Sequence, residues 1–159
     1  MIQRIQTIYL AIAAVATIIL LFIPIGYFAT ADYGFEYNAF VVKDRTPDGG
    51  IYMSTLYLGL TLIISAIFSI VAIFLYKNRS RQIKVVYANM FIFLFAILLM
   101  LYIYPSLVFV KQGLLGPDDP IQYNYWILAC LIPAAAGLFL ANNAIKKDEK
   151  LIRSADRLR

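Results

Sequence analysis

Four long stretches without a charged residue constrain the fold of this chain more than any other feature. They cover residues 5–31, 49–76, 85–110 and 120–145, and each contains a dense block of Ile, Leu, Phe and Ala. About 20 apolar residues in a helix are enough to cross a hydrocarbon core of about 30 Å. The chain is 62% hydrophobic and 14% charged, unlike soluble domains. These features predict an all-α integral membrane protein.

The apolar blocks predict a single domain, residues 1–159, built as a four-helix transmembrane bundle. Pro, Gly and Tyr clusters mark the ends of the blocks, because Pro and Gly end helices and Tyr prefers the membrane interface. A cleaved signal peptide is the alternative for the first block, but its apolar run exceeds the usual core of about 7 to 15 residues, which favours an uncleaved anchor. The predicted spans cover residues 5–27, 53–76, 85–104 and 125–145, and a tail follows at 146–159.

The distribution of Lys and Arg predicts the orientation of these spans. Eleven of the 14 basic residues lie at the N-terminus, between the second and third blocks, or in the tail, and the remaining three are Lys43, Arg45 and Lys111. Basic residues in short connections are retained on the cytoplasmic side of a membrane. We therefore expect both termini in the cytoplasm. The net charge of +5 is interpreted as a topology signal, which predicts anionic lipid headgroups as partners and no nucleic acid.

The connection over residues 28–51 contains two runs that favour β-strands. Phe35 and Tyr37 alternate with polar residues, and the apolar residues 40–42 precede the segment 46–50, Thr-Pro-Asp-Gly-Gly. A turn signal between two such runs predicts a short extracytoplasmic β-hairpin between the first two helices, ending near Tyr52. We interpret this hairpin as a cover over the helix ends in preference to a docking surface.

The residue types needed for most site chemistry are missing. The chain has no His, and its single Cys, Cys130, lies within the fourth block. No Asp, Glu, Lys or Arg lies inside a predicted span, which argues against proton relays and ion-coupled transport. Without His, imidazole metal ligands and the usual Ser/His or Cys/His nucleophiles are absent. We therefore predict no catalytic, cofactor-binding or metal site, and a protein that is not an enzyme.

Small residues at helical spacing predict where the spans pack against each other. Ser65 and Ser69 are four residues apart in the second block, and Gly137 and Ala141 are four residues apart in the fourth. Small residues at this spacing let helix backbones approach closely in lipid. These four residues are the candidate helix-packing positions, and Pro133, four residues before Gly137, is the expected site of a mid-span bend.

The tail predicts an amphipathic helix, because it continues the fourth block without Gly or Pro and its apolar residues recur at helical spacing. With the N-terminus and the basic connection 77–84, this helix forms the predicted interaction surface on the cytoplasmic face. We expect Arg4 to lie near Asp148 or Glu149. The candidate interaction residues are Arg4, Lys77, Arg79, Arg81, Lys84, Ile152, Arg153, Asp156, Arg157 and Leu158.

The two ends of the chain carry its most specific sequence signatures. Residues 1–7, Met-Ile-Gln-Arg-Ile-Gln-Thr, and residues 153–159, Arg-Ser-Ala-Asp-Arg-Leu-Arg, resemble those of a Bacteroidota family of small four-span membrane proteins. This family is a domain of unknown function, the four-two-nine-three family, and the resemblance extends over the whole chain in length and span order. It implies a bacterial inner membrane location and no assigned activity.

The distribution of polar residues favours one functional hypothesis over another. Because the spans lack chemistry and the termini are rich in charge, we predict a structural or accessory subunit. Its cytoplasmic termini would contact a partner complex or anionic lipid, the partner being another membrane protein or a second copy of the chain. The alternative is a small transporter, channel or lipid-binding carrier for an uncharged or amphiphilic ligand, held within the bundle.

Overall fold

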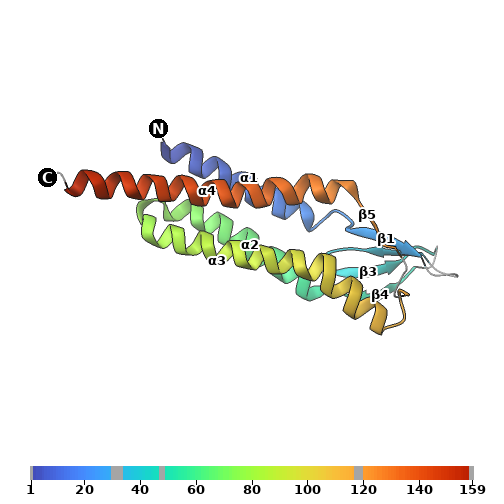
Figure 1. Cartoon of the computed structure of the whole chain (residues 1–159). Helices are drawn as coiled ribbons and strands as arrows, with labels where there is room; N and C mark the ends of the chain where they lie inside the picture. The colour runs from blue at the N-terminus through green and yellow to red at the C-terminus, as the bar shows by residue number, and fades with distance from the viewer. Residues whose placement is uncertain (1, 30–33, 47–48, 117–119, 158–159) are drawn as a thin grey trace.

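Four long helices run side by side along most of the molecule, and a small β-sheet lies at one end (Figure 1). The computed structural model describes residues 2–29, 34–46, 49–116 and 120–157. The two chain ends lie at the opposite end from the sheet, and we call these the termini end and the sheet end. The helices are α1 (Ile2–Leu20), α2 (Leu56–Phe74), α3 (Arg79–Leu98) and α4 (Tyr125–Arg157).

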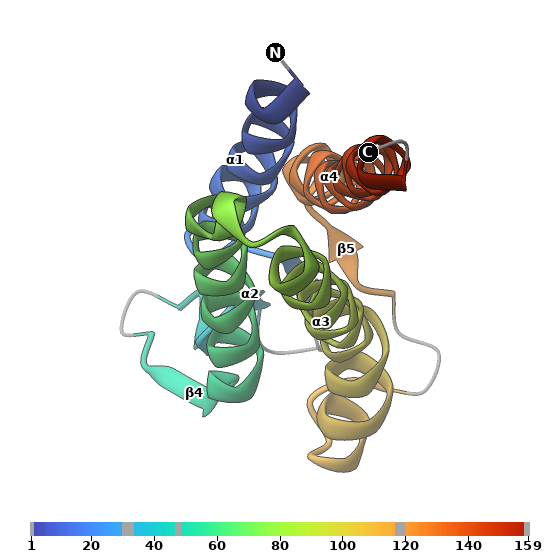
Figure 2. The ribbon, with the colours of Figure 1, turned by 90° about the vertical axis from the view of Figure 1, so that its left-hand side faces the viewer.

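Each helix packs against two others, as the view along the bundle shows (Figure 2). α1 and α3 both contact α2 and α4, and the most extensive of these interfaces joins α1 to α4. A short 3₁₀ turn, η1 (Leu75–Lys77), connects α2 to α3. Three helical segments are long and apolar enough to cross a membrane, namely Leu56–Lys77, Arg79–Phe109 and Tyr125–Leu151, whereas the apolar helix Ile5–Leu20 is shorter. The chain is therefore mostly helical, and the length and composition of these helices suggest a membrane protein.

The sheet has five antiparallel strands in the order β4-β3-β2-β1-β5. The strand β5 comes from the connection before α4, and it pairs with β1 through Tyr27 opposite Gln122. A single hairpin was expected here, so the prediction missed most of the sheet. The strands are β1 (Gly26–Ala29), β2 (Gly34–Tyr37), β3 (Val41–Asp44), β4 (Ile51–Ser54) and β5 (Gln122–Tyr123).

Aromatic side chains attach this sheet to the bundle. Phe28 and Phe35 are buried and stacked with ring centroids 5.3 Å apart, and Phe109 packs on Phe28 at 5.2 Å and on Tyr37 at 5.1 Å. Alternate residues of a strand point to one face, so these buried rings form the face that meets the helices. Burial raises the pKa of the Tyr37 phenol far above its usual range, which keeps this side chain neutral.

The predicted ends of the first two helices were wrong. α1 ends at Leu20 and Tyr27 lies in β1, while α2 begins at Leu56 and Met53 lies in β4. Pro24 cannot continue a helix because it lacks a backbone donor. Short apolar runs do not distinguish a strand from a buried helix, and only pairing with neighbouring strands assigns these segments to the sheet.

The last two helices are longer than predicted. α3 begins at Arg79 rather than at Val85, so most of the expected basic connection is helical. From Leu99 it continues as a wide π-helical segment, η2 (Leu99–Phe109), which contains Pro105 and extends past the predicted end at Tyr104. The wider turn accommodates a residue that cannot donate a backbone hydrogen bond. α4 runs through Pro133 to Arg157, so the predicted tail helix is the final part of the same helix.

Candidate functional site at the termini end

A buried polar contact ties α1 to α4 near the termini end. The Gln6 side-chain amide donates a hydrogen bond to Asp148 Oδ2, although the two residues are far apart in sequence. Arg79 of α3 lies on the other side, with its guanidinium nitrogen 3.9 Å from the same carboxylate oxygen. Asp148 is only 4% exposed and Arg79 is 21% exposed. A single carboxylate therefore joins three helices.

Two further contacts of this kind join α2 to α3. Ser65 donates a hydrogen bond of 2.8 Å to Asn89 Oδ1, and the Asn89 amide donates one of 2.7 Å to the Ser69 hydroxyl. Nearer the termini end, the Gln82 amide donates to the Ala72 carbonyl at 2.9 Å. Ser65 and Ser69 thus lie at a helix interface, where the sequence placed them, and their hydroxyls bond across it.

Close packing rather than hydrogen bonding characterises the middle of the α1–α4 interface. A Cβ atom on Gly137 would lie 2.7 Å from the Tyr9 carbonyl oxygen and 3.2 Å from the Ala13 Cβ atom. Ala141, one turn further along α4, is fully buried. Glycine is required at residue 137 because no other side chain fits between these backbones, as in other small-residue helix contacts.

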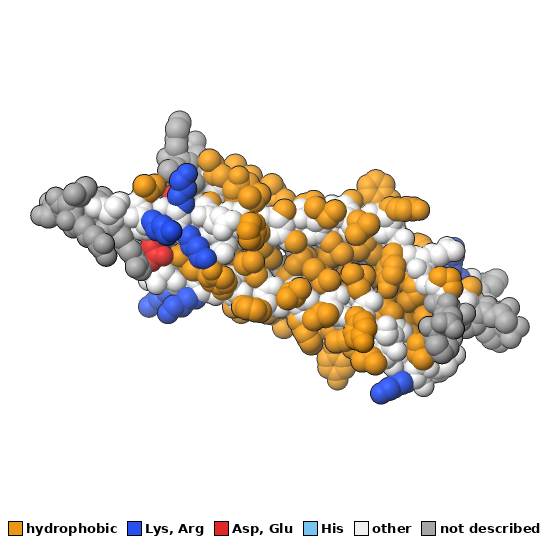
Figure 3. Space-filling view, in the orientation of Figure 1, with side chains coloured by type: hydrophobic (Ala, Val, Ile, Leu, Met, Phe, Trp, Pro, Cys, Tyr) orange, Lys and Arg blue, Asp and Glu red, His pale blue; other side chains and the backbone are white. Residues whose placement is uncertain are grey.

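The residues predicted to form an interaction surface divide into three groups. Lys77, Arg81 and Lys84 are exposed, whereas Arg79 is partly withdrawn toward Asp148. In Figure 3 the described Lys and Arg side chains gather mainly near the termini end, and hydrophobic side chains cover the middle of the molecule. The side chains of Arg4, Ile152, Arg153, Asp156 and Arg157, and the whole of Leu158, lie outside the described part of the chain. The expected contact of Arg4 with Asp148 or Glu149 is consequently still a prediction.

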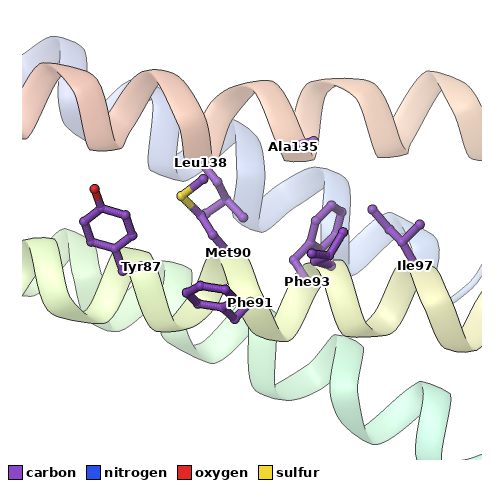
Figure 4. Close-up of a pocket in the computed structure, with 8 residues that line it drawn as sticks. Tyr87, Met90, Phe91, Phe93, Ile97, Ala135 and Leu138 are labelled. Carbon is purple, nitrogen blue, oxygen red and sulfur yellow. The ribbon is translucent and has the colours of Figure 1, made fainter.

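A groove of about 300 Å³ runs between α3 and α4 along the middle of the bundle (Figure 4). Phe93, which is 3% exposed, lies at the floor of the groove. Phe91, which is 71% exposed, lies on its outer wall. Figure 4 shows the Tyr87 hydroxyl pointing from α3 toward α4 at one end of the groove. The lining consists of Tyr87, Met90, Phe91, Phe93, Leu94, Ile97, Ala135 and Leu138.

Polar groups of α4 meet the Tyr87 hydroxyl at this end of the groove. The Lys146 ammonium group donates a hydrogen bond to it and lies 4.6 Å from the centre of the ring. The buried Asn142 side chain also contacts Tyr87. Within the described residues, Asn142 Oδ1 has no hydrogen-bond partner. The groove is therefore lined by apolar side chains along its length. At one end it has the positive charge of Lys146 and the oxygen of Asn142 that is unpaired among the described residues.

Sequence reasoning did not single out Gln6 or Gln82, and it treated Asp148 only as a neighbour of Arg4. A signal for two of them was present. Gln6 falls on the same helical stripe as the buried Leu10, and Asp148 falls on the stripe of the buried Ile145. Polar residues that continue a buried stripe are expected to find partners across the interface.

The described residues contain no group of three or more His, Cys, Asp or Glu side chains placed to hold a metal ion. Cys130 is a free, buried thiol. The arrangement at the termini end consists of amide, hydroxyl, carboxylate and ammonium groups that bond across helix interfaces. These groups hold neighbouring helices together.

The fold and these contacts define a small helical-bundle protein with membrane-suited helices and a β-sheet at one end. The chain belongs to the family described as Domain of unknown function (DUF4293), which matches residues 2–158. This match confirms the family resemblance noted at the two ends of the chain. No curated protein matches the chain.

Proposed function

We propose that the chain is a four-span protein of a bacterial inner membrane, with both termini in the cytoplasm. α1 is the fourth span, and its shorter apolar helix is supported by extensive packing along α4 and α2. The exposed Lys77, Arg81 and Lys84 at the termini end support this orientation, because basic residues remain on the cytoplasmic side.

Labelling of single cysteines tests this orientation in a Cys130→Ser background. Ser80→Cys and Ser154→Cys lie at exposed positions of the termini end, and Thr46→Cys lies at an exposed position of the connection between β3 and β4, at the sheet end. A membrane-impermeant maleimide added to intact spheroplasts is expected to label only Thr46→Cys, and the other two are labelled after permeabilisation. Labelling of Ser80→Cys in intact spheroplasts would overturn the orientation.

Within this topology we propose a non-enzymatic accessory role, in which the termini end contacts a partner membrane protein or anionic lipid. The observation that carries it is the division of polar side chains. Those between the helices, such as Gln6 and Asn89, are engaged with neighbouring helices, whereas Arg81 and Lys84 face outward. The charges of Arg81 and Lys84 are therefore available for an external surface.

Chemical crosslinking in native membranes tests the accessory role. The double variant Arg81→Glu and Lys84→Glu reverses two exposed charges at the termini end, and Lys43→Glu with Arg45→Glu reverses two exposed charges at the sheet end. We expect the first variant, but not the second, to lose the crosslinked partner band while keeping its membrane level. An unchanged band in both variants would contradict a partner surface at the termini end.

A lipid-binding carrier is the second candidate, and the apolar groove between α3 and α4 is the observation that favours it. A carrier and an accessory subunit differ in whether they must release a bound lipid. A carrier must release its ligand to a second membrane, so transfer of labelled lipid between two vesicle populations distinguishes it from an accessory subunit.

A further inference from the structure

The dimensions of the groove between α3 and α4 match one leaflet of a bilayer. From Tyr87 to Ile97 the lining advances about 15 Å along α3, at 1.5 Å per residue. Half of a hydrocarbon core of about 30 Å is the same length. A groove of this length fits a chain that enters from the headgroup region and stops near the middle of the membrane.

The shape of the groove opens it to the surrounding lipid rather than to the centre of the bundle. Phe93 and Leu138 form a buried floor, while Phe91 and Leu94 form an exposed wall. Figure 4 shows the side chains of Met90 from α3 and Leu138 from α4 lying between the two helices. An aliphatic chain can therefore enter sideways from the bilayer and pack against apolar side chains along its length.

The end of the groove has the chemistry to hold an anionic headgroup. Lys146 provides a positive charge, and its contact with the Tyr87 hydroxyl places two potential donors side by side. Asn142 Oδ1 is a buried acceptor that no donor satisfies among the described residues. Such an atom is costly to leave unpaired, so a headgroup hydroxyl that reaches it would gain a hydrogen bond.

We propose that this groove binds one acyl chain of an anionic phospholipid, with the phosphate held by Lys146 and Tyr87 and a headgroup hydroxyl meeting Asn142. The inference depends on the membrane insertion proposed above but not on the accessory role. Phosphatidylglycerol has both the negative phosphate and the hydroxyls that the site can use, whereas phosphatidylcholine has no hydroxyl or N–H donor in its headgroup.

Native mass spectrometry of the full chain in a nonionic detergent measures this binding directly. The probes are phosphatidylglycerol and phosphatidylcholine with identical acyl chains, each titrated into the protein. We expect one phosphatidylglycerol molecule to bind more tightly than phosphatidylcholine. Glycerol 3-phosphate, which has the phosphate without the chain, is not expected to displace it.

Two pairs of neighbouring variants locate the site. Ala135→Trp fills the groove, and Ala136→Trp places the same bulk at the next exposed position, outside the lining. Lys146→Ala removes the cation that contacts Tyr87, and Lys147→Ala removes the same charge from an exposed neighbour. We expect Ala135→Trp to weaken phosphatidylglycerol binding at least about tenfold and Lys146→Ala about fivefold, with much smaller changes in both neighbours.

The outcomes separate a built site from general lipid adhesion. Equal losses within each pair would show that phosphatidylglycerol binds only through the overall positive charge, and would overturn the proposal. So would equal affinity for the two lipids in the unmodified protein. If Ala135→Trp does not fold, the comparison of Lys146→Ala with Lys147→Ala still decides the matter, because both changes alter side chains at the surface.

Discussion

α4 meets its two neighbouring helices in contrasting ways. Toward α1 it presents Gly137, and the backbones approach so closely that a Cβ atom there would collide with the Tyr9 carbonyl group. Toward α3 it presents Ala135, which also lacks bulk, yet the facing side chains of α3 leave a groove. The contrast shows that a small residue produces close packing only where the residue opposite it is also small, as Ala13 of α1 is opposite Gly137.

The largest effect is expected from Gly137→Leu, which breaks the α1–α4 interface. The new side chain has no space beside Tyr9 and Ala13, and overpacking of this kind costs about 3 kcal/mol of unfolding free energy. Thermal unfolding in detergent measures the change. Ala136→Leu is the control, because its position is exposed. Equal stability of the two variants would mean that α1 is free to move away from α4.

Asp148→Ala is expected to have the next largest effect, because Asp148 contacts both neighbours of α4. It leaves the buried Gln6 amide without its acceptor, which costs about 2 kcal/mol. Asp148→Asn sharpens the comparison, since it keeps an acceptor for Gln6 and removes only the charge near Arg79. We expect less than about 1 kcal/mol for this change. Equal losses in both variants would assign the main contact to Arg79 of α3.

A smaller effect is expected from Asn89→Leu at the α2–α3 interface, which relies on hydrogen bonds. The substitution keeps similar volume and removes the bonds with Ser65 and Ser69. Hydrogen bonds between helices in membranes contribute about 0.6 kcal/mol each, and the serine hydroxyls can turn back to carbonyls of their own helix. We expect a loss of about 1 kcal/mol in the same unfolding assay. A loss larger than that of Gly137→Leu would rank hydrogen bonding above close packing in this bundle.

The smallest effect is expected from Ala135→Leu, two residues from Gly137 on the same helix. Its side chain enters the groove beside Phe93 and Leu138, where there is space. The stability is therefore expected to change by no more than about 0.5 kcal/mol. A loss comparable to that of Gly137→Leu would show that the two interfaces of α4 are packed alike.

The positions of the helix contacts were largely readable from the sequence. Ser65, Ser69, Gly137 and Ala141 were predicted from their spacing, and all four are buried. A helix face depends on local periodicity, which a sequence displays directly. The partners of these residues were not predictable in the same way. Asn89 and Tyr9 lie on other helices, and their register depends on how the helices slide and rotate against each other.

The sheet and the groove show where local pattern stops being informative. Tyr27 and Met53 lie in apolar runs that fit a helix or a strand, and β1 is identified only by its pairing with β2 and β5. Strand β5 comes from the distant segment before α4. The groove likewise arises because the side chains of α3 pack less closely against α4 than those of α1 do. The sequence of a single helix does not display this difference.

The sequence by itself determined the apolar helices, the small-residue faces and the concentration of positive charge near the termini, because each depends on composition or on spacing along a single segment. The tertiary structure alone decided that Gln6 reaches Asp148, that β5 completes the sheet and that Lys146 meets Tyr87 at the end of an apolar groove. These contacts join segments far apart in the chain, and their geometry follows from the packing of whole helices rather than from any local preference.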